Sequence, residues 1–220
     1  AISGTINGGG GVDTLTGPNA ATTWTFGGVN AGTIGLDDFT AIENVVGGTG
    51  VDTFVVGAGR VASVDGGNGD DVLQAGAAGT VWNVTGAAAG NGTIAGQALP
   101  FTSIETVALT FADVDDDVRV TQRAAGGISI EPVDAGDFAA ATVTSTIASP
   151  AFRIETRGGN DEVLVDSLRQ GFVAPLTIAL GDGNDAAVTA VAAAFSAQLR
   201  VDGGAGLDAH DDLALLPAAN

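Results

Sequence analysis

The stretches GGTGVD at positions 47–52 and GGNGDD at positions 66–71 repeat one pattern after 19 residues. Each has two glycines, a variable residue, a third glycine and, two positions later, an aspartate. Glycine adopts positive φ and lets another chain approach closely, and aspartate accepts hydrogen bonds from nearby backbone amides. The pattern therefore predicts a tight corner that the chain turns repeatedly in the same way.

The corners recur at a nearly constant spacing. Gly-Gly pairs, or single glycines in the equivalent place, begin at residues 8, 27, 47, 66 and 86, in steps of 19 or 20 residues. The spacing widens to 21–23 residues in RGGNDEVLV from Arg157, LGDGNDAAV from Leu180 and VDGGAGLDA from Val201. A period of this length is typical of proteins that stack one short unit on the next.

A longer repeat is superposed on this period. The segment TTWTFGGVNAGTIG and the following FTAIENV, within 22–45, match TVWNVTGAAAGNGTI and FTSIETV, within 80–107. We interpret each long unit as three short coils, and we expect its tryptophan to fill the core at the same position around the axis. The matched pairs are Trp24 with Trp82, Ile34 with Ile94 and Glu43 with Glu105.

Short runs of alternating polar and apolar residues, such as TWTF, VWNV, FRIET and LRVD, predict half-buried strands. Helix start signals followed by an apolar stripe are scarce. Short strands joined by glycine-rich corners predict an all-β fold, a right-handed parallel β-helix (β-solenoid) of roughly ten coils stacked at the strand spacing. The apolar side chains of all coils would then form one continuous core.

We expect three regions along this solenoid. Residues 1–107 would hold two tandem three-coil repeats. Residues 108–157 would continue the solenoid with degenerate repeats and an acidic loop, ADVDDDVRV at 112–120. That loop is interpreted as a solvated connection, with a cation site as the alternative. Residues 158–220 would form coils of wider period.

The side-chain inventory excludes several kinds of chemistry. The 220 residues contain no Cys, Met, Tyr or Lys, and seven Arg and one His stand against 26 acidic residues. A thiol nucleophile, a cysteine zinc site, a lysine Schiff base and a multi-histidine metal centre are therefore excluded. The net charge of −19 argues against nucleic acid as a partner. No apolar run reaches the length of about 18 residues that membrane insertion requires.

The corners also resemble a known family. GGGGVDTLT, GGTGVDTFV and GGNGDDVLQ look like the haemolysin-type (RTX) calcium-binding repeat G-G-x-G-x-D-x-U-x, and RGGNDEVLV and GDGNDAAV look like shortened variants. The wider texture is similar to repeat arrays of very large secreted or surface-displayed bacterial proteins, many of them adhesin-like. The resemblance implies that glycine carbonyls and the sixth-position aspartates of successive corners bind Ca²⁺. The matching aspartates are Asp13, Asp52, Asp71 and Asp208, with Asp161 and Asp185 in the shortened variants.

The sequence also departs from that family. RTX rolls repeat the motif every nine residues, whereas here one motif occurs per coil. Ca²⁺ takes six to eight oxygen ligands, so one corner is insufficient and two adjacent corners are required. Neighbouring corners are expected only for Asp52 with Asp71, and for Asp161, Asp185 and Asp208. The alternative is that these carboxylates simply make turn and ladder hydrogen bonds.

The leading functional hypothesis is a non-enzymatic structural or adhesive rod, stiffened by calcium, within a larger extracellular or cell-surface bacterial protein. The absence of Cys and Met, the acidic composition and the calcium-like corners fit an oxidising, calcium-rich exterior. Open solenoid ends expose unpaired strand edges, so we expect neighbouring solenoid domains or further copies to stack end to end, as in a filament. Contact with an extracellular surface or polysaccharide is a further expectation.

Two alternatives belong to other classes. One is a polysaccharide-acting enzyme on a parallel β-helix, for which seven dispersed Arg and no Lys or Tyr provide few groups to hold an acidic sugar. The other is a carbohydrate-binding or partner-binding module, for which a row of exposed aromatic residues would be the distinguishing feature.

Overall fold

The structure is a computed structural model that describes residues 4–76, 79–123, 126–134, 138–145, 147–168, 172–192 and 197–215. These residues form 22 strands and no α-helix, so the all-β prediction is confirmed. The strands make two long sheets, here called sheet A and sheet B. No helix suited to crossing a membrane occurs in the described ranges.

Sheet A has ten strands in the spatial order β1-β5-β4-β3-β7-β9-β13-β17-β19-β21. Their bounds are β1 (Ile6–Asn7), β3 (Thr23–Gly28), β4 (Ala31–Ile34), β5 (Asp37–Thr40), β7 (Thr53–Val56), β9 (Val72–Gly76), β13 (Thr106–Thr110), β17 (Ala151–Glu155), β19 (Leu176–Ala179) and β21 (Leu199–Asp202).

Sheet B has twelve strands in the order β2-β6-β8-β12-β11-β10-β16-β15-β14-β18-β20-β22. Their bounds are β2 (Thr14–Thr16), β6 (Asn44–Gly48), β8 (Ser63–Gly67), β10 (Val81–Gly86), β11 (Ala89–Ile94), β12 (Gln97–Thr102), β14 (Asp117–Gln122), β15 (Gly127–Pro132), β16 (Ala141–Thr144), β18 (Glu162–Leu168), β20 (Ala186–Ala192) and β22 (Ala209–Leu215).

The chain alternates between the two sheets. Every strand or group of consecutive strands in sheet A is followed by one in sheet B, and each sheet is entered eight times in the described residues. Strands that belong to successive entries pair in parallel, as β7 with β9, β6 with β8 and β18 with β20 do. Eight entries are fewer than the roughly ten coils expected, because part of the chain is spent on antiparallel strands.

Those antiparallel strands form three meanders, which the periodicity did not predict. They are β3-β4-β5 in sheet A, and β10-β11-β12 and β14-β15-β16 in sheet B. The segments 22–45 and 80–107 therefore do not wind as three coils each. Gly27 and Gly86, which were expected at corners, lie in β3 and β10, where each strand carries an irregularity next to its hairpin turn.

The core lies between the sheets, and strand residues alternate toward it. In β7, Phe54 and Val56 are buried while Thr53 and Val55 are only half-buried. Inward residues from successive strands then meet one another, and the ring of Trp24 stacks on that of Phe54 with centroids 5.7 Å apart. This period of two is what one buried sheet face requires.

Both tryptophans fill the core, as expected, and both are completely buried. They do not occupy the same position around it. Trp24 lies in β3 of sheet A, whereas Trp82 lies in β10 of sheet B, because the two matching meanders belong to opposite sheets. The two copies of the sequence repeat therefore form the same local meander, one in sheet A and one in sheet B.

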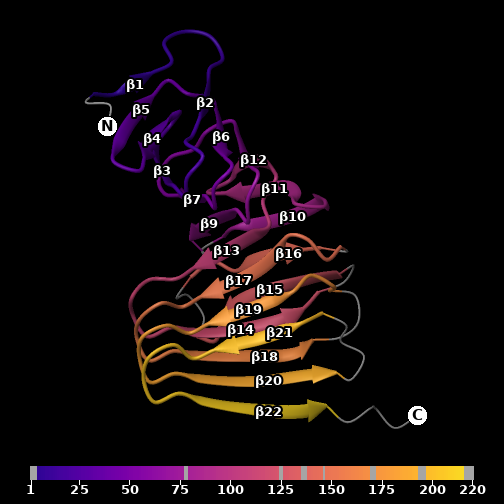
Figure 1. Cartoon of the computed structure of the whole chain (residues 1–220). Coiled ribbons are helices and arrows are strands. Elements are labelled where there is room, and N and C mark those ends of the chain that lie inside the picture. The colour runs from indigo at the N-terminus through magenta and orange to yellow at the C-terminus, as the bar shows by residue number, and fades with distance from the viewer. Residues whose placement is uncertain are drawn as a thin grey trace.

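The first and the last strands of the chain lie at opposite ends of the two sheets (Figure 1). Strands β1 and β2 are the outermost strands of sheets A and B at one end, and β21 and β22 are outermost at the other. Figure 1 shows the later strands, from β13 to β22, lying one above another. The three regions expected at 1–107, 108–157 and 158–220 stay a prediction.

Candidate functional site

The six aspartates predicted from the motifs lie at two different kinds of corner. Asp52 and Asp71 end connections that run from sheet B to sheet A, before β7 and β9. The other four end connections that run from sheet A to sheet B: Asp13, Asp161, Asp185 and Asp208, before β2, β18, β20 and β22. The corners therefore form two separate rows, here called the B-to-A row and the A-to-B row.

In the B-to-A row, the corners are joined by hydrogen bonds from backbone to carboxylate. The Asp52 N–H donates to Asp71 Oδ1 at 2.7 Å, and the Asp71 N–H donates to Glu105 Oε2 at 2.8 Å. Asp52 and Asp71 are both completely buried. The carboxylates of Asp71 and Glu105 thus each accept from the corner of the preceding pass, and Asp52 and Asp71 lie on adjacent passes.

Glycine makes this arrangement possible, because the aspartate side chain folds back over its own corner. A Cβ on Gly66 would lie 2.6 Å from Asp71 Oδ2 and would also collide with the Ser103 carbonyl oxygen. A Cβ on Gly47 would lie 2.5 Å from Asp52 Oδ2. The first glycine of the motif therefore leaves room for the aspartate five positions later and for the next pass of the chain.

Burial raises the pKa of Asp71 to about 6; the Asp52 amide lowers that pKa, and the charges of Asp52, Glu105 and Asp70 raise it further. Burial also raises the pKa of Asp52, against the opposing effect of the Thr22 backbone. Both carboxyl groups hold their protons more tightly than exposed aspartates do, because little solvent is available to stabilise the charge.

The A-to-B row has the same polarity over four passes. The Asp116 N–H donates to Asp161 Oδ1 at 2.9 Å, and the Asp161 N–H donates to Asp185 Oδ1 at 2.9 Å. The Asp185 N–H then donates to Asp208 Oδ1 at 3.2 Å. Asp161 and Asp185 are buried, whereas Asp208, on the last pass, is exposed. The three aspartates expected to be neighbours are therefore brought together.

Burial raises the pKa of Asp161 as well. The Thr156 hydroxyl and the Asp116 amide lower this pKa, and the negative charges of Asp185 and Asp115 raise it. The main cause is thus the same on both sides of the molecule: burial removes a carboxyl group from water, and the charged neighbours that act on it are negative.

An exposed row of side chains runs beside the buried one. The Asn160 N–H donates to Asp115 Oδ1 at 2.7 Å, and the Asn184 N–H donates to Asn160 Oδ1 at 3.1 Å. The Leu207 N–H donates to Asn184 Oδ1, also at 3.1 Å. Asx side chains therefore stack corner on corner at two successive positions of the motif.

Asp13 lies at the opposite end of the molecule from the other A-to-B aspartates. Its N–H donates to Glu43 Oε2 at 2.8 Å, and Glu43 Oε1 also accepts a 2.6 Å hydrogen bond from Asn30 Nδ2. Asp13 is half-buried. It shares the connection type of Asp161, Asp185 and Asp208 but is not adjacent to them.

Motif matching missed three members of these rows: Glu43, Glu105 and Asp116. Each directly precedes a strand, in the place that a motif aspartate takes on a neighbouring pass. The signal for two of them was present, since Glu43 and Glu105 are matched positions of FTAIENV and FTSIETV. The longer glutamate side chain reaches the same amide without a glycine corner. Asp116 lies in the acidic loop at 112–120.

Several buried carboxylate oxygens have no hydrogen-bond partner among the residues that the structure describes. They are Asp13 Oδ2, both oxygens of Asp52, and Oδ2 of Asp71, Asp161 and Asp185. These oxygen atoms are of the kind that a hard cation such as Ca²⁺ prefers. Within the described ranges, however, no three acidic or histidine side chains converge as a metal centre built from side chains alone would. The donors fit calcium in kind, and backbone carbonyls and water would have to complete the ligand set.

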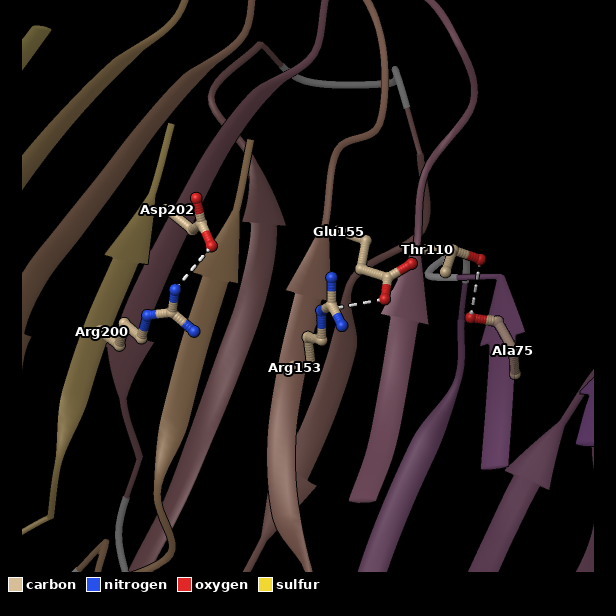
Figure 2. Close-up of polar contacts among 6 residues, drawn as sticks. All are labelled: Ala75, Thr110, Arg153, Glu155, Arg200 and Asp202. Carbon is tan, nitrogen blue, oxygen red and sulfur yellow. Dashed lines mark hydrogen bonds and ion pairs between the residues drawn. The ribbon is translucent and has the colours of Figure 1, made fainter. Parts of the chain in front are cut away.

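The outer face of sheet A carries arginines that are already paired (Figure 2). Arg153 on β17 lies 3.0 Å from Glu155, and Arg200 on β21 lies 2.8 Å from Asp202. Figure 2 also shows Thr110 donating to the Ala75 carbonyl oxygen, at 3.3 Å, between neighbouring strands. Each arginine is neutralised by an acid two residues further along its own strand.

The exposed large apolar side chains of the described residues are all aliphatic, and no row of exposed aromatic rings accompanies these arginines. Comparison with protein-family models, with curated proteins and with solved structures finds no match to this chain.

Proposed function

We propose that the chain is a β-solenoid rod with a structural or adhesive role, forming part of a larger extracellular or cell-surface bacterial protein and carrying no enzymatic activity. Support for the solenoid comes from the strict alternation between two sheets and from the parallel pairing of successive passes. The right-handed sense is the one that parallel crossover connections nearly always take.

The observation that carries the proposal is the pair of carboxylate rows. A backbone amide at each of these corners donates to the carboxylate on the following pass, in both rows. This contact stabilises the stack of passes, because it satisfies a backbone amide of one pass with a carboxylate of the next. Carboxylates placed in this way hold successive passes together, so they would make the stack rigid along its axis.

Calcium is the cation we propose for these rows, because acidic oxygens without partners accumulate there. Asp52 and Asp71 would hold it in the B-to-A row, and Asp161, Asp185 and Asp208 in the A-to-B row, together with backbone carbonyl oxygens. When bound, the ion supplies positive charge that offsets the cost of burying ionised carboxylates. The chain's own residues supply the oxygens and the fixed spacing between passes.

A role without catalysis is supported by the outer surface. Arg153 and Arg200 pair with acids of their own strands, so binding an acidic sugar there would first have to break those ion pairs. Extracellular placement rests on composition, since a chain with no Cys and no Met, a net charge of −19 and calcium-type corners suits an oxidising exterior that is rich in calcium.

Small-angle scattering of the purified chain tests the rod. We expect an elongated particle whose pair-distance distribution has one short cross-section and a long tail, because the passes add along one axis. A compact, near-spherical distribution at the same molecular mass would overturn the proposed rod.

Thermal melting in calcium and in chelator at pH 7.5 tests the ion. A ligand that binds only the folded state raises the melting temperature. We expect calcium to raise it for the natural chain, and to raise it less for Asp71→Asn and for Asp161→Asn. Asp70→Asn is the matched control, because Asp70 is exposed and adjoins Asp71 in the same corner. An identical melting temperature in calcium and in chelator would refute the calcium part of the proposal.

A further inference from the structure

Asparagine followed by glycine occurs three times in the sequence, as Asn7-Gly8, Asn68-Gly69 and Asn91-Gly92, and all three pairs lie in the described residues. Such a pair is chemically labile, because glycine has no side chain that hinders its backbone nitrogen from reaching the side-chain carbonyl carbon, Cγ, of the asparagine before it. The reaction requires a glycine nitrogen that is free to react and an asparagine side chain that is free to turn. The three pairs differ in both respects.

The surroundings of Asn7-Gly8 hold both reacting groups. The Gly8 N–H donates to the Thr40 carbonyl oxygen at 3.0 Å, at the end of the pairing of β1 with β5. Asn7 Oδ1 accepts from the Gly9 N–H at 2.9 Å, so the side-chain amide is held against the backbone two residues later. The Gly8 nitrogen would have to leave Thr40 before it could attack.

Asn91-Gly92 lies inside sheet B. Both residues belong to β11, which pairs with β10 on one side and with β12 on the other. Asn91 Oδ1 accepts from the Leu99 N–H at 3.1 Å, and Gly92 is buried. A Cβ on Gly92 would collide with the Trp82 ring, so the indole covers this glycine. The sheet and the ring together enclose the nitrogen.

Asn68-Gly69 occupies the exposed part of the B-to-A corner between β8 and β9. The Asn68 N–H donates to the Gly48 carbonyl oxygen at 2.9 Å, which fixes the corner on the preceding pass. In the part of the chain that the structure describes, no hydrogen bond involves the Gly69 N–H or the Asn68 side chain. Both reacting groups are therefore free at this corner, and solvent reaches them.

We propose that Asn68 is a site of spontaneous deamidation through a succinimide, and that the fold protects Asn7 and Asn91 from the same reaction. The Gly69 nitrogen loses its proton and forms a bond to Asn68 Cγ. The bond from Cγ to Nδ2 breaks, and Nδ2 takes up a proton and leaves as ammonia. Water then opens the ring. Its addition at Cγ gives aspartate, and its addition at the Asn68 backbone carbonyl carbon gives isoaspartate, in which the main chain runs through Cγ.

Both products add a negative charge to a corner that already carries two acids. Asp70 is exposed and Asp71 is buried. Burial, and with it the charge of Asp70, already raises the pKa of Asp71. A carboxylate at position 68 acts in the same direction, since it opposes the ionisation of its neighbours. The aspartate product thus changes the charge of the B-to-A row and leaves the path of the main chain unchanged.

Isoaspartate changes the backbone as well, because it inserts one methylene carbon into the main chain at position 68. The corner is stacked too closely to take up this carbon: a Cβ on Gly67 would collide with the Gly48 carbonyl oxygen, and one on Gly69 with that of Gly50. The two neighbouring passes therefore have to separate here. We expect the hydrogen bond from the residue at position 68 to Gly48 to be lost, and the modified chain to melt at a lower temperature.

Peptide mapping by mass spectrometry tests the proposal. One sample of the natural chain is incubated folded at mildly alkaline pH, and a second is incubated in denaturant. In the folded sample we expect Asn68 to react about tenfold faster than Asn7 and Asn91, because a hydrogen bond or a strand pairing must open first at those two. In denaturant the three rates should become similar. The measurement depends neither on the proposed rod nor on calcium, so either can fail without the other.

Equal rates at the three asparagines in the folded chain would overturn the proposal. The same holds if Asn7 or Asn91 reacts fastest, or if Asn68 stays intact in the folded chain while it reacts in denaturant.

Two variants transfer the pair to matched positions. Thr49-Gly50 takes the same place in the preceding corner, where Thr49 is exposed and the Gly50 N–H has no acceptor among the described residues. We expect Thr49→Asn to create a second reactive site. Ala31→Asn is the control, because Ala31-Gly32 matches Asn91-Gly92 in the other meander and β4 is likewise paired on both sides. A new site at 31 that reacts as fast as the one at 49 would contradict protection by strand pairing.

A last pair of variants connects the modification to stability. Asn68→Ser removes the side-chain amide, and Asn68→Asp supplies the aspartate product without isoaspartate. We expect the melting temperature of the natural chain to fall during incubation, below that of fresh Asn68→Asp, and that of Asn68→Ser to stay constant. An equal fall in Asn68→Ser would show that the loss of stability arises elsewhere in the chain, against the proposed effect on this corner.

Discussion

The backbone N–H of Asp52 donates a 2.7 Å hydrogen bond to Oδ1 of Asp71, which lies 19 residues later on the next pass of the chain. Both side chains are fully buried, and Asp71 Oδ2 has no hydrogen-bond partner in the described part of the chain. Asp71 thus has two opposite effects on stability. Its Oδ1 stabilises the fold by accepting from a buried amide. Its negative charge destabilises the fold, because the ionised carboxylate is buried away from water.

The pKa of Asp71 leads to a prediction about pH. Because burial raises this pKa from 3.8 to about 6, the folded chain binds the proton more tightly than the unfolded chain does. Asp71 therefore contributes stability below about pH 4 that is lost as pH rises through 6. In calcium-free melts, we expect Asp71→Asn to become more stable than the natural chain between pH 5 and pH 7.5.

The control for that series is Asp70→Asn, which removes one exposed charge from the same corner. Its melting temperature should follow that of the natural chain across the pH range much more closely. A natural chain that gains stability relative to Asp71→Asn as pH rises would show that the carboxylate is stabilised by a charge partner, and the assigned cause would be wrong.

Removing a row carboxylate should leave a buried amide without an acceptor. Asp185 Oδ1 accepts from the Asp161 N–H at 2.9 Å inside the A-to-B row. We expect Asp185→Ala to lower the free energy of unfolding by about 1–3 kcal/mol, because an unsatisfied buried donor costs that much. Asp185→Asn, which keeps an acceptor oxygen, should lose less. Asp182→Ala, in the same corner but exposed, is the control. Denaturant titration measures all three.

The corner glycines should differ in their tolerance of a methyl group. At Gly66, a Cβ would collide with the Ser103 carbonyl oxygen and lie 2.6 Å from Asp71 Oδ2, so we expect Gly66→Ala to destabilise the chain by about 1–3 kcal/mol or more. At Gly10, no described atom lies within 4 Å, and φ is not in the left-handed region. Gly10→Ala should therefore be neutral. Equal melting temperatures for the two variants would contradict the stacking of corners.

The aromatic contacts of Trp24 predict a large cost for its loss. Its ring stacks on Phe54 and meets Phe39 edge-on, with centroids 5.7 and 6.1 Å apart. We expect Trp24→Ala to cost about 3–5 kcal/mol, as other large core deletions do. Trp24→Phe should cost much less, because the indole N–H has no hydrogen-bond partner to lose. Val12→Ala, at an exposed position, is the control for both.

The local chemistry of the corners was predictable from sequence. A GGxGxD motif needs glycine where the next pass approaches and an acid that can accept from an amide, and Asp52 over Asp71 follows from that need together with the 19-residue period. The alternation of polar and apolar residues in TWTF and FRIET likewise predicted the strands β3 and β17, in which Trp24 and Phe152 are buried in the core.

The 19–20-residue spacing of glycines did not predict the three antiparallel meanders. Gly27 keeps the 19–20-residue spacing of the corners, yet it lies in β3 beside a hairpin turn. A glycine favours a corner and a hairpin turn for the same reason, its backbone freedom, so spacing alone does not separate the two. Pairing between β3, β4 and β5 decides it, and that pairing depends on which strands are neighbours in space.

By itself, the sequence determined that this is an all-β chain with repeated Gly-Asp corners and with buried aromatic rings, because turn chemistry and the period of two are local properties. Only the tertiary structure decided that Asp13 lies on the other side of the molecule from Asp52, and that Glu43 and Glu105 join the rows. The side on which a corner lies depends on how many strands the chain forms before it. That number is decided by strand pairing between residues far apart in the sequence, so local patterns do not determine it.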